Sequence, residues 1–217
     1  MKPQYKAVLF DLDGTLIDTN ELIIQSFQQV LNGRFPGKYS RESILPFLGP
    51  TLRETFTAID PVNVEAMMEE YRTWNLANHD DMVEAFPGVV ETIQQLSASG
   101  VKLAIVSTKR NEMVMRALDL MGITDYFETV IGLDDVTHAK PDPEPVRLAL
   151  SRLGVSPEDA LMVGDNFHDI IAARAAGADS VAVAWSIKGL DYLLAFEPVY
   201  SIHHISEILG IVFGEAQ

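Results

Sequence analysis

The sequence predicts an α/β protein with a parallel sheet at its core and a block of helices inserted into that core. Short apolar runs typical of buried strands alternate with segments of helical period, as in parallel α/β sheets. One long interval near the start of the chain does not follow this alternation. We expect the strands at residues 6–10, 102–106, 129–132, 160–163 and 180–184. We expect the intervening helices at about 88–99, 110–121, 143–153 and 168–176.

The interval that breaks the alternation lacks strand signals. It carries amphipathic runs at 21–31, 51–58 and 63–75. We interpret residues 19–83 as an inserted helical cap domain, which leaves residues 1–18 and 84–217 to form the α/β core domain. A chain of 217 residues has room for one core domain with such an insertion.

Composition favours a soluble protein of the cytoplasm. Apolar residues make up 47% of the chain, which is ample for a buried core, and there are no cysteines. Without cysteine, disulfide bonds and thiolate metal sites are excluded. No apolar run approaches the roughly 18 residues of a membrane span, and no basic start is followed by an apolar stretch. We therefore expect neither a membrane span nor a signal peptide, and we expect a cytoplasmic monomer.

The net charge of −15 bounds the partners of the chain. A nucleic acid or an anionic membrane requires a basic surface, so this charge argues against both. It also repels an anionic substrate at long range. Local cations must then recruit such a substrate, and the candidates are a bound Mg2+, Lys140 and the N-termini of helices.

The segment at residues 10–18, Phe-Asp-Leu-Asp-Gly-Thr-Leu-Ile-Asp, is the most informative part of the chain. Asp11 and Asp13 directly follow a predicted strand, and strand side chains two residues apart point the same way. Carboxylates this close repel each other, and a hard divalent cation such as Mg2+ relieves the repulsion. Gly14 allows a tight turn whose N–H groups can cradle an anion, and Thr15 adds a hydroxyl. An acidic turn without function is the alternative for this segment alone.

Three further segments carry polar side chains at comparable places. Ser107 and Thr108 follow the second predicted strand, and Asp165 follows the fourth. Asp169 comes four residues after Asp165, and Lys140 lies in a proline-rich loop between the two strands. In open parallel sheets, the loops at the carboxyl ends of the strands converge. Ser107 and Asp165 can therefore share one pocket with Asp11 and Asp13.

In this order and spacing, the four segments resemble the four motifs of the haloacid dehalogenase superfamily of phosphotransferases. The resemblance covers essentially the whole chain. It implies a Rossmann-like parallel sheet core, the haloacid dehalogenase fold, with a helical cap inserted between the first and second motifs. In that family the cap closes over the active site like a lid.

The chemistry of phosphoryl transfer suggests a role for each motif residue. Such a reaction needs a nucleophile in line, neutralised phosphoryl oxygens and a proton for the leaving group. We predict that Asp11 is the nucleophile and forms an aspartyl-phosphate, which water later hydrolyses. We predict that Asp13 protonates the leaving oxygen and then activates the water. Ser107 is expected to donate to a phosphoryl oxygen, and Lys140 to place a positive charge on the same group.

The predicted cofactor is Mg2+. Asp11 and Asp165 are expected to bind it, and the resemblance adds the backbone carbonyl of Asp13, with water completing the shell. Asp169 lies one helical turn beyond Asp165 and can orient metal-bound waters. A helix-capping role is the alternative for Asp169.

The choice of a small anionic phosphorylated substrate is expected to depend on the cap and on loops around the pocket. Gly49 precedes a predicted helix with free N–H groups, and Arg53 can grip an anion with two hydrogen bonds. A plain turn with a surface arginine is the alternative. Lys109 can reach the pocket mouth, and Trp185 either lines the rim or packs. The predicted substrate-binding residues are Gly14, Thr15, Thr108, Lys109, Gly49 and Arg53.

Branches of the superfamily can be compared at single positions. Asp13 argues against the dehalogenase branch, which typically lacks a second aspartate and does not use Mg2+. Neither the cap lysine nor the first motif of phosphonatases is present. Ile23 stands where mutases of the β-phosphoglucomutase type carry a histidine. A non-catalytic binding protein would have lost a motif residue, and here each motif position is intact.

The closest resemblance is to inorganic pyrophosphatases of the superfamily, and it extends into the cap and the flanks. It is carried by residues 19–24, 47–50, 133–137, 139–146, 163–169 and 184–189. It implies hydrolysis of pyrophosphate to two phosphates. It also implies a link to serine dephosphorylation of the phosphocarrier protein HPr, which generates pyrophosphate by phosphorolysis. Phosphoglycolate phosphatase stays the alternative, because its substrate is small and anionic too.

Overall fold

The computed structural model describes residues 3–214 and divides the chain into two compact units. One unit is the helical segment Asp18–Glu84, and the other comprises the residues through Ile17 together with those from Ala85 onward. The chain passes between them at β2 (Ile17–Asp18) and β3 (Glu84–Ala85), which pair as a two-stranded sheet. None of the helices in the described range is long and apolar enough to cross a membrane.

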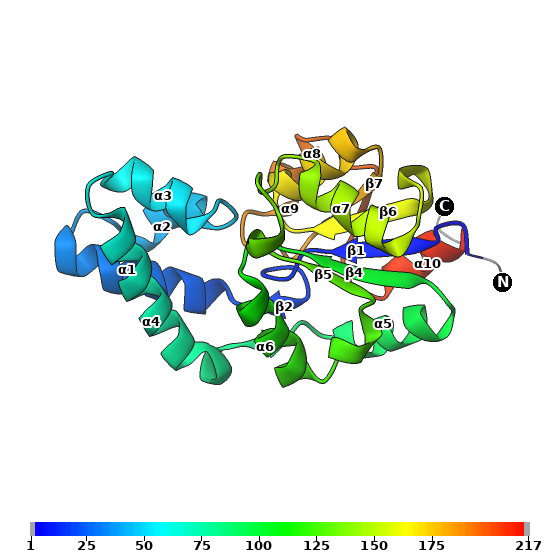
Figure 1. Ribbon diagram of the computed structural model, residues 1–217, viewed down its shortest axis with the longest axis horizontal. Coiled ribbons are helices and arrows are strands. Elements are labelled where there is room, and N and C mark those ends of the chain that lie inside the picture. Colours follow the sequence, from blue (N-terminus) through cyan, green and yellow to red (C-terminus); the bar gives the residue numbers. More distant parts are fainter. Residues whose placement is uncertain (1–2, 215–217) are drawn as a thin grey trace. The chain divides into compact units, whose positions relative to one another are not determined.

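The larger unit is built on a six-stranded parallel sheet (Figure 1). Its strand order is β5-β4-β1-β6-β7-β8, so the chain first builds outward from β1 on one side and then on the other. The prediction of an α/β protein with a Rossmann-like parallel core is therefore confirmed. The strands are β1 Ala7–Phe10, β4 Lys102–Val106, β5 Thr129–Ile131, β6 Ala160–Gly164, β7 Asp179–Val183 and β8 Tyr200–Ile202.

Helices cover both faces of this sheet (Figure 1). The α-helices of this unit are α5 Val89–Ala98, α6 Asn111–Met121, α7 Glu144–Leu153, α8 Phe167–Ala176, α9 Leu190–Leu194 and α10 Glu207–Phe213. Short 3-10 turns lie at Thr124–Tyr126, Leu133–Asp135 and Pro157–Asp159. The sequence predicted the first four helices to within two residues and missed α9 and α10.

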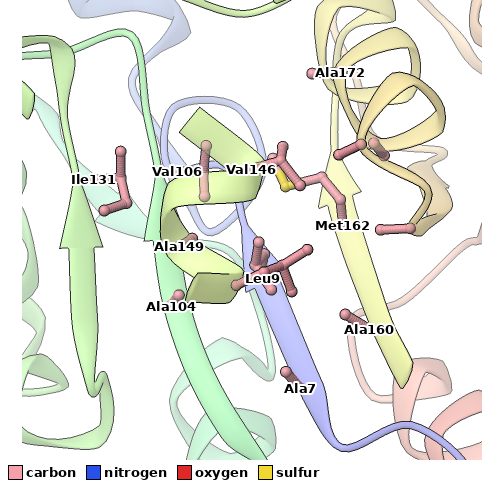
Figure 2. Close-up of a cluster of buried hydrophobic side chains, with 14 of the residues drawn as sticks. Ala7, Leu9, Ala104, Val106, Ile131, Val146, Ala149, Ala160, Met162 and Ala172 are labelled. Carbon is pink, nitrogen blue, oxygen red and sulfur yellow. The ribbon is translucent and has the colours of Figure 1, made fainter. Parts of the chain in front are cut away.

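Figure 2 shows the core on the face covered by α7 and α8. Leu9 of β1 and Met162 of β6 point to this face and pack with Val146 of α7 and Ala172 of α8. Small residues such as Ala149 allow the helix to lie close to the strands at the density of a protein interior. This packing fixes the strands, and the strand ends then carry the polar side chains described below.

Strand register places three loops at one edge of the sheet. Phe10, the last residue of β1, pairs with Ile105 of β4 and with Val163 of β6. The residues that follow each of these strands therefore leave the sheet nearly level with one another. The order of strands reverses at β1, which is where open α/β sheets bind their ligands.

The helical unit contains α1 Asn20–Arg34, α2 Arg41–Ile44, α3 Leu52–Ile59 and α4 Val64–Met82, with a 3-10 turn at Leu45–Phe47. Its interior is aromatic: the ring of Phe27 lies 5.4 Å from those of Phe47 and Phe56 and 4.9 Å from that of Tyr71, between ring centres. The sequence predicted α1, α3 and α4, although α1 and α4 extend further, and it missed the single-turn α2. That this unit acts as a cap stays a prediction.

Candidate active site

Three buried carboxylates meet at the carboxyl edge of the sheet. Asp11 follows β1, Asp165 follows β6, and Asp169 lies in the first turn of α8. Carboxylate oxygens of the three residues lie within 4.8 Å of one another, and each side chain is buried. The structure thus brings together three of the residues that the sequence singled out.

Asp169 is held in place by the start of its own helix. Asn166 precedes α8, and its backbone N–H donates to Asp169 Oδ2 at 3.1 Å, as part of a capping box. The capping role that was the alternative for Asp169 is therefore present. It leaves Oδ1 of the same carboxylate for a second partner.

That partner is Lys140, which links the carboxylates. Its Nζ donates to Asp169 Oδ1 at 2.7 Å, to Asp11 Oδ1 at 2.8 Å and to the backbone carbonyl of Val106 at 2.6 Å. Lys140 is only 4% exposed, so its charge is scarcely screened by water. Lys140 thus lies beside Asp11, and its predicted role at a phosphoryl group stays a prediction.

Burial perturbs the ionisation of these groups. Burial raises the pKa of Asp11 to about 7, although the charge of Lys140 opposes the rise. Burial, together with the charges of Asp11 and Asp169, raises the pKa of Asp165 well above its ordinary value. Burial by itself lowers the pKa of Lys140, but the charges of Asp11 and Asp169 outweigh it and raise that pKa. Ionising the three carboxylates together is therefore costly unless further positive charge is supplied.

Two glycines allow the carboxylates to come this close. A Cβ atom at Gly14 would lie 2.4 Å from Asp165 Oδ2, and one at Gly164 would lie 2.2 Å from Asp169 Oδ2. Gly14 also has a φ of +77°, a backbone conformation that residues other than glycine rarely adopt. The result is a compact, buried set of oxygen donors, which is the donor set that Mg2+ prefers, so the residues present fit that ion.

Two backbone N–H groups of the turn after Asp13 already have hydrogen-bond partners within the turn. The N–H of Gly14 donates to the carbonyl of Ile17 at 2.8 Å, and the N–H of Thr15 donates to that of Leu12 at 3.3 Å. These two N–H groups close the turn, so neither is available to bind an anion. An anion cradle formed by the other N–H groups of this segment stays a prediction. The Thr15 hydroxyl is fully buried and finds no hydrogen-bond partner among residues 3–214.

Asp13 and the loop after β4 form a second group at this edge. Lys109 Nζ lies 2.5 Å from Asp13 Oδ1, and both side chains are partly buried. Ser107 is buried, and its Oγ accepts the backbone N–H of Lys109 at 3.1 Å. Thr108, between them, is partly exposed. The sequence expected Lys109 near the pocket mouth, but its ion pair with Asp13 was not foreseen.

The two predicted residues of the helical unit lie at the start of α3. Gly49 has a φ of +114°, and Thr51 and Glu54 form a capping box that occupies N–H groups expected to be free. Arg53, with a side chain 59% exposed, pairs with Glu65 at 2.6 Å. The plain surface arginine that was the alternative describes Arg53 within its own unit, and a substrate contact stays a prediction.

Sequence reasoning assigned no role to Lys188. This residue lies in the loop after β7, partly buried, where the charges of Asp165 and Asp169 act on it. Ser186 in the same loop donates from Oγ to the backbone carbonyl of Asp165 at 2.7 Å. The available signal was position, because Lys188 stands a few residues beyond a predicted strand whose end shares this edge of the sheet.

Fold and site together define a haloacid dehalogenase-like hydrolase. The model of that family, described as haloacid dehalogenase-like hydrolase, matches residues 8–183, and the chain belongs to this family.

Individual proteins and structures that are similar to this chain are more specific than the family model. The chain is 51% identical to pyrophosphatase PpaX of Bacillus velezensis over 205 residues, which cover 94% of this chain and 95% of that protein. A haloacid dehalogenase-like hydrolase structure from Bacteroides fragilis matches 94% of this chain and 99% of its own, at a TM-score of 0.88 and 30% identity. A predicted phosphoglycolate phosphatase from Haemophilus somnus shares the fold, with a TM-score of 0.84, 23% identity, and coverage of 96% of this chain and 98% of its own.

Proposed function

We propose that this protein is a Mg2+-dependent phosphohydrolase that hydrolyses inorganic pyrophosphate to two phosphates. The reaction class rests on one observation: Asp11 is buried at a strand end, bonded to Lys140 and beside Asp165 and Asp169. The substrate rests on the 51% identity to a relative named as a pyrophosphatase, which extends over almost the whole chain.

Asp11, Asp165 and the backbone carbonyl of Asp13 hold the metal in this proposal, and Asp169 orients its waters. When bound, Mg2+ neutralises charge on the carboxylates and on the phosphoryl group. Asp169 has a further task, because it also fixes the position of Lys140.

The protein groups carry out the transfer in two steps. Asp11 attacks the phosphorus atom, the bond to the leaving phosphate breaks, and the leaving oxygen takes its proton from Asp13. Water then attacks the aspartyl-phosphate and gives a proton back to Asp13, which releases the second phosphate and restores both aspartates. Lys140 and Ser107 hold the oxygens of the transferred group throughout.

The ion pair of Asp13 with Lys109 suggests how the substrate enters this scheme. Asp13 must release Lys109 before it can serve as an acid, and an anionic substrate can draw Lys109 away.

Residues 19–83 act as the cap in this proposal. The proposed substrate contacts are Thr108 and Lys109 of the core, with Gly49 and Arg53 of the cap. Gly14 and Thr15 contribute through the turn that they form. Action in the cytoplasm as a monomer, and a link to HPr serine dephosphorylation, are part of the same proposal.

The decisive test compares two substrates on one preparation. We expect kcat/KM with Mg2+ to favour pyrophosphate over 2-phosphoglycolate by about a hundredfold, or roughly 2.7 kcal/mol. The reverse preference would assign the protein to phosphoglycolate hydrolysis. The variant Asp11→Asn should fold like the wild type and lose turnover with both substrates. A wild-type rate in that variant would remove Asp11 from the nucleophile role.

A further inference from the structure

The loop between β7 and α9 is tied to the carboxylate site by its own side chains. Ser186, which is buried, donates from Oγ to the backbone carbonyl of Asp165 at 2.7 Å. Trp185 donates from Nε1 to the backbone carbonyl of Thr15 at 3.2 Å. The loop is thereby bonded to the segment that carries Asp165 and to the turn that follows Asp11. Its position relative to the site is fixed by the fold.

The same contacts fix Lys188. Its backbone N–H donates to Ser186 Oγ at 3.2 Å, and the N–H of Gly189 closes the turn on the carbonyl of Ser186 at 2.9 Å. The side chain is partly buried, with Nζ 5.9 Å from the centre of the Tyr192 ring. Burial lowers the pKa of Lys188, while the negative charges of Asp165 and Asp169 oppose that change. The ammonium group is thus held within electrostatic range of two site carboxylates.

A charge count shows what this lysine changes. Asp11, Asp165 and Asp169 carry three negative charges when ionised, and Lys140 and Lys188 return two positive ones. A divalent cation would then leave the group with a net positive charge. Without Lys188 the same loaded group would be neutral. Before a cation binds, the group carries −1 with Lys188 and −2 without it, so Lys188 weakens the attraction for the cation. After binding, the net positive charge attracts a phosphate dianion.

We infer that Lys188 is a positioning residue that sets the charge of the metal-loaded site, weakening Mg2+ binding and strengthening the hold on a phosphate dianion. This inference rests on the proposed function. The ammonium group of Lys188 lowers the affinity of the site for Mg2+ and raises its affinity for an anion. At the site, it thereby offsets the repulsion that the overall charge of −15 exerts on an anionic substrate.

The test measures binding without turnover. Titration calorimetry on Lys188→Met should give a Mg2+ dissociation constant lower than that of the wild type on the order of tenfold. At saturating Mg2+, the dissociation constant for inorganic phosphate should rise by a similar factor. Lys188→Arg keeps the charge and should stay close to the wild type in both titrations. Lys6→Met, which removes an exposed lysine paired with Asp159, controls for the loss of one positive charge from the protein.

The outcomes separate this inference from the proposal beneath it. If Lys188→Met binds Mg2+ or phosphate within twofold of the wild type, the inference is overturned. The proposed function would still stand in that case, provided that the wild type binds Mg2+ and cleaves pyrophosphate. If the wild type binds no Mg2+, the proposed function fails together with the inference. Should the Met variant not fold, Lys188→Gln carries the same test.

Discussion

Replacing Lys140 with methionine removes the cation that bridges Asp11 and Asp169. The ammonium group of Lys140 donates at 2.8 Å to Asp11, at 2.7 Å to Asp169 and at 2.6 Å to the carbonyl of Val106. Methionine fills a similar volume but leaves these acceptors without that donor. Removing one partner of a buried ion pair typically costs about 3–5 kcal/mol, because the other charge stays buried. We expect a loss of this size at pH 8 in the presence of chelator.

A matched control isolates the effect of burial. Lys6→Met removes the same side chain from an ion pair with Asp159 at 2.5 Å, but the Lys6 side chain is 60% exposed. Exposed pairs contribute about 0–1 kcal/mol. Thermal unfolding followed by circular dichroism should place the melting temperature of Lys140→Met below that of Lys6→Met by about 10 °C.

The comparison can refute the reasoning. If the two variants melt within about 2 °C of each other, the buried carboxylates do not depend on Lys140 for charge compensation. A second variant, Lys140→Met with Asp169→Asn, removes one of the stranded charges. The double variant should be more stable than Lys140→Met alone, because one fewer buried carboxylate is left without its cation. The effects of the two substitutions are therefore not additive.

Three further predictions concern the metal and the turn that supports it. Activity should require Mg2+ and be inhibited by Ca2+, whose looser coordination disturbs the in-line arrangement; full activity in excess chelator would contradict this. With chelator, the stability that Asp11 contributes through its raised pKa is complete below the ordinary value of 3.8 and is lost as the pH rises through about 7. Added Mg2+ should therefore raise the melting temperature more at pH 8 than at pH 5.5, and an equal rise would argue against it. Gly14→Ala should cost roughly 2 kcal/mol or more from strain and weaken Mg2+ binding, since its Cβ would meet Asp165 Oδ2 at 2.4 Å. Gly33→Ala, with open space around it, should be neutral or stabilising, and equal melting temperatures for the two variants would exclude the clash.

Much of the core could be predicted because its signals are local. A buried parallel strand shows as an apolar run, and five of the six strands of the main sheet were predicted in this way. The sixth, β8 at Tyr200–Ile202, was missed because only Ile202 is buried and three residues carry no period. The short helices α2 and α9 were missed for the same reason, since one turn is too short for a helical pattern.

The residues of the candidate site were also predictable only in part. The positions of Asp11 and Asp165 followed from strand ends, and Lys140 from a resemblance in order and spacing. Nothing in the local sequence pairs Lys109 with Asp13 or brings Lys188 to Asp165, because each of these meetings joins different loops.

By itself, the sequence determined which residues of suitable chemistry the protein has and at which strand ends they stand. Strand and helix patterns depend on neighbours a few residues apart, so they can be read from the chain. Only the tertiary structure decided which atoms meet. Lys140 reaches Asp11 across 129 positions of sequence, and Lys109 reaches Asp13 across 96. Such contacts depend on strand order and on burial, and the packing of the whole core sets both.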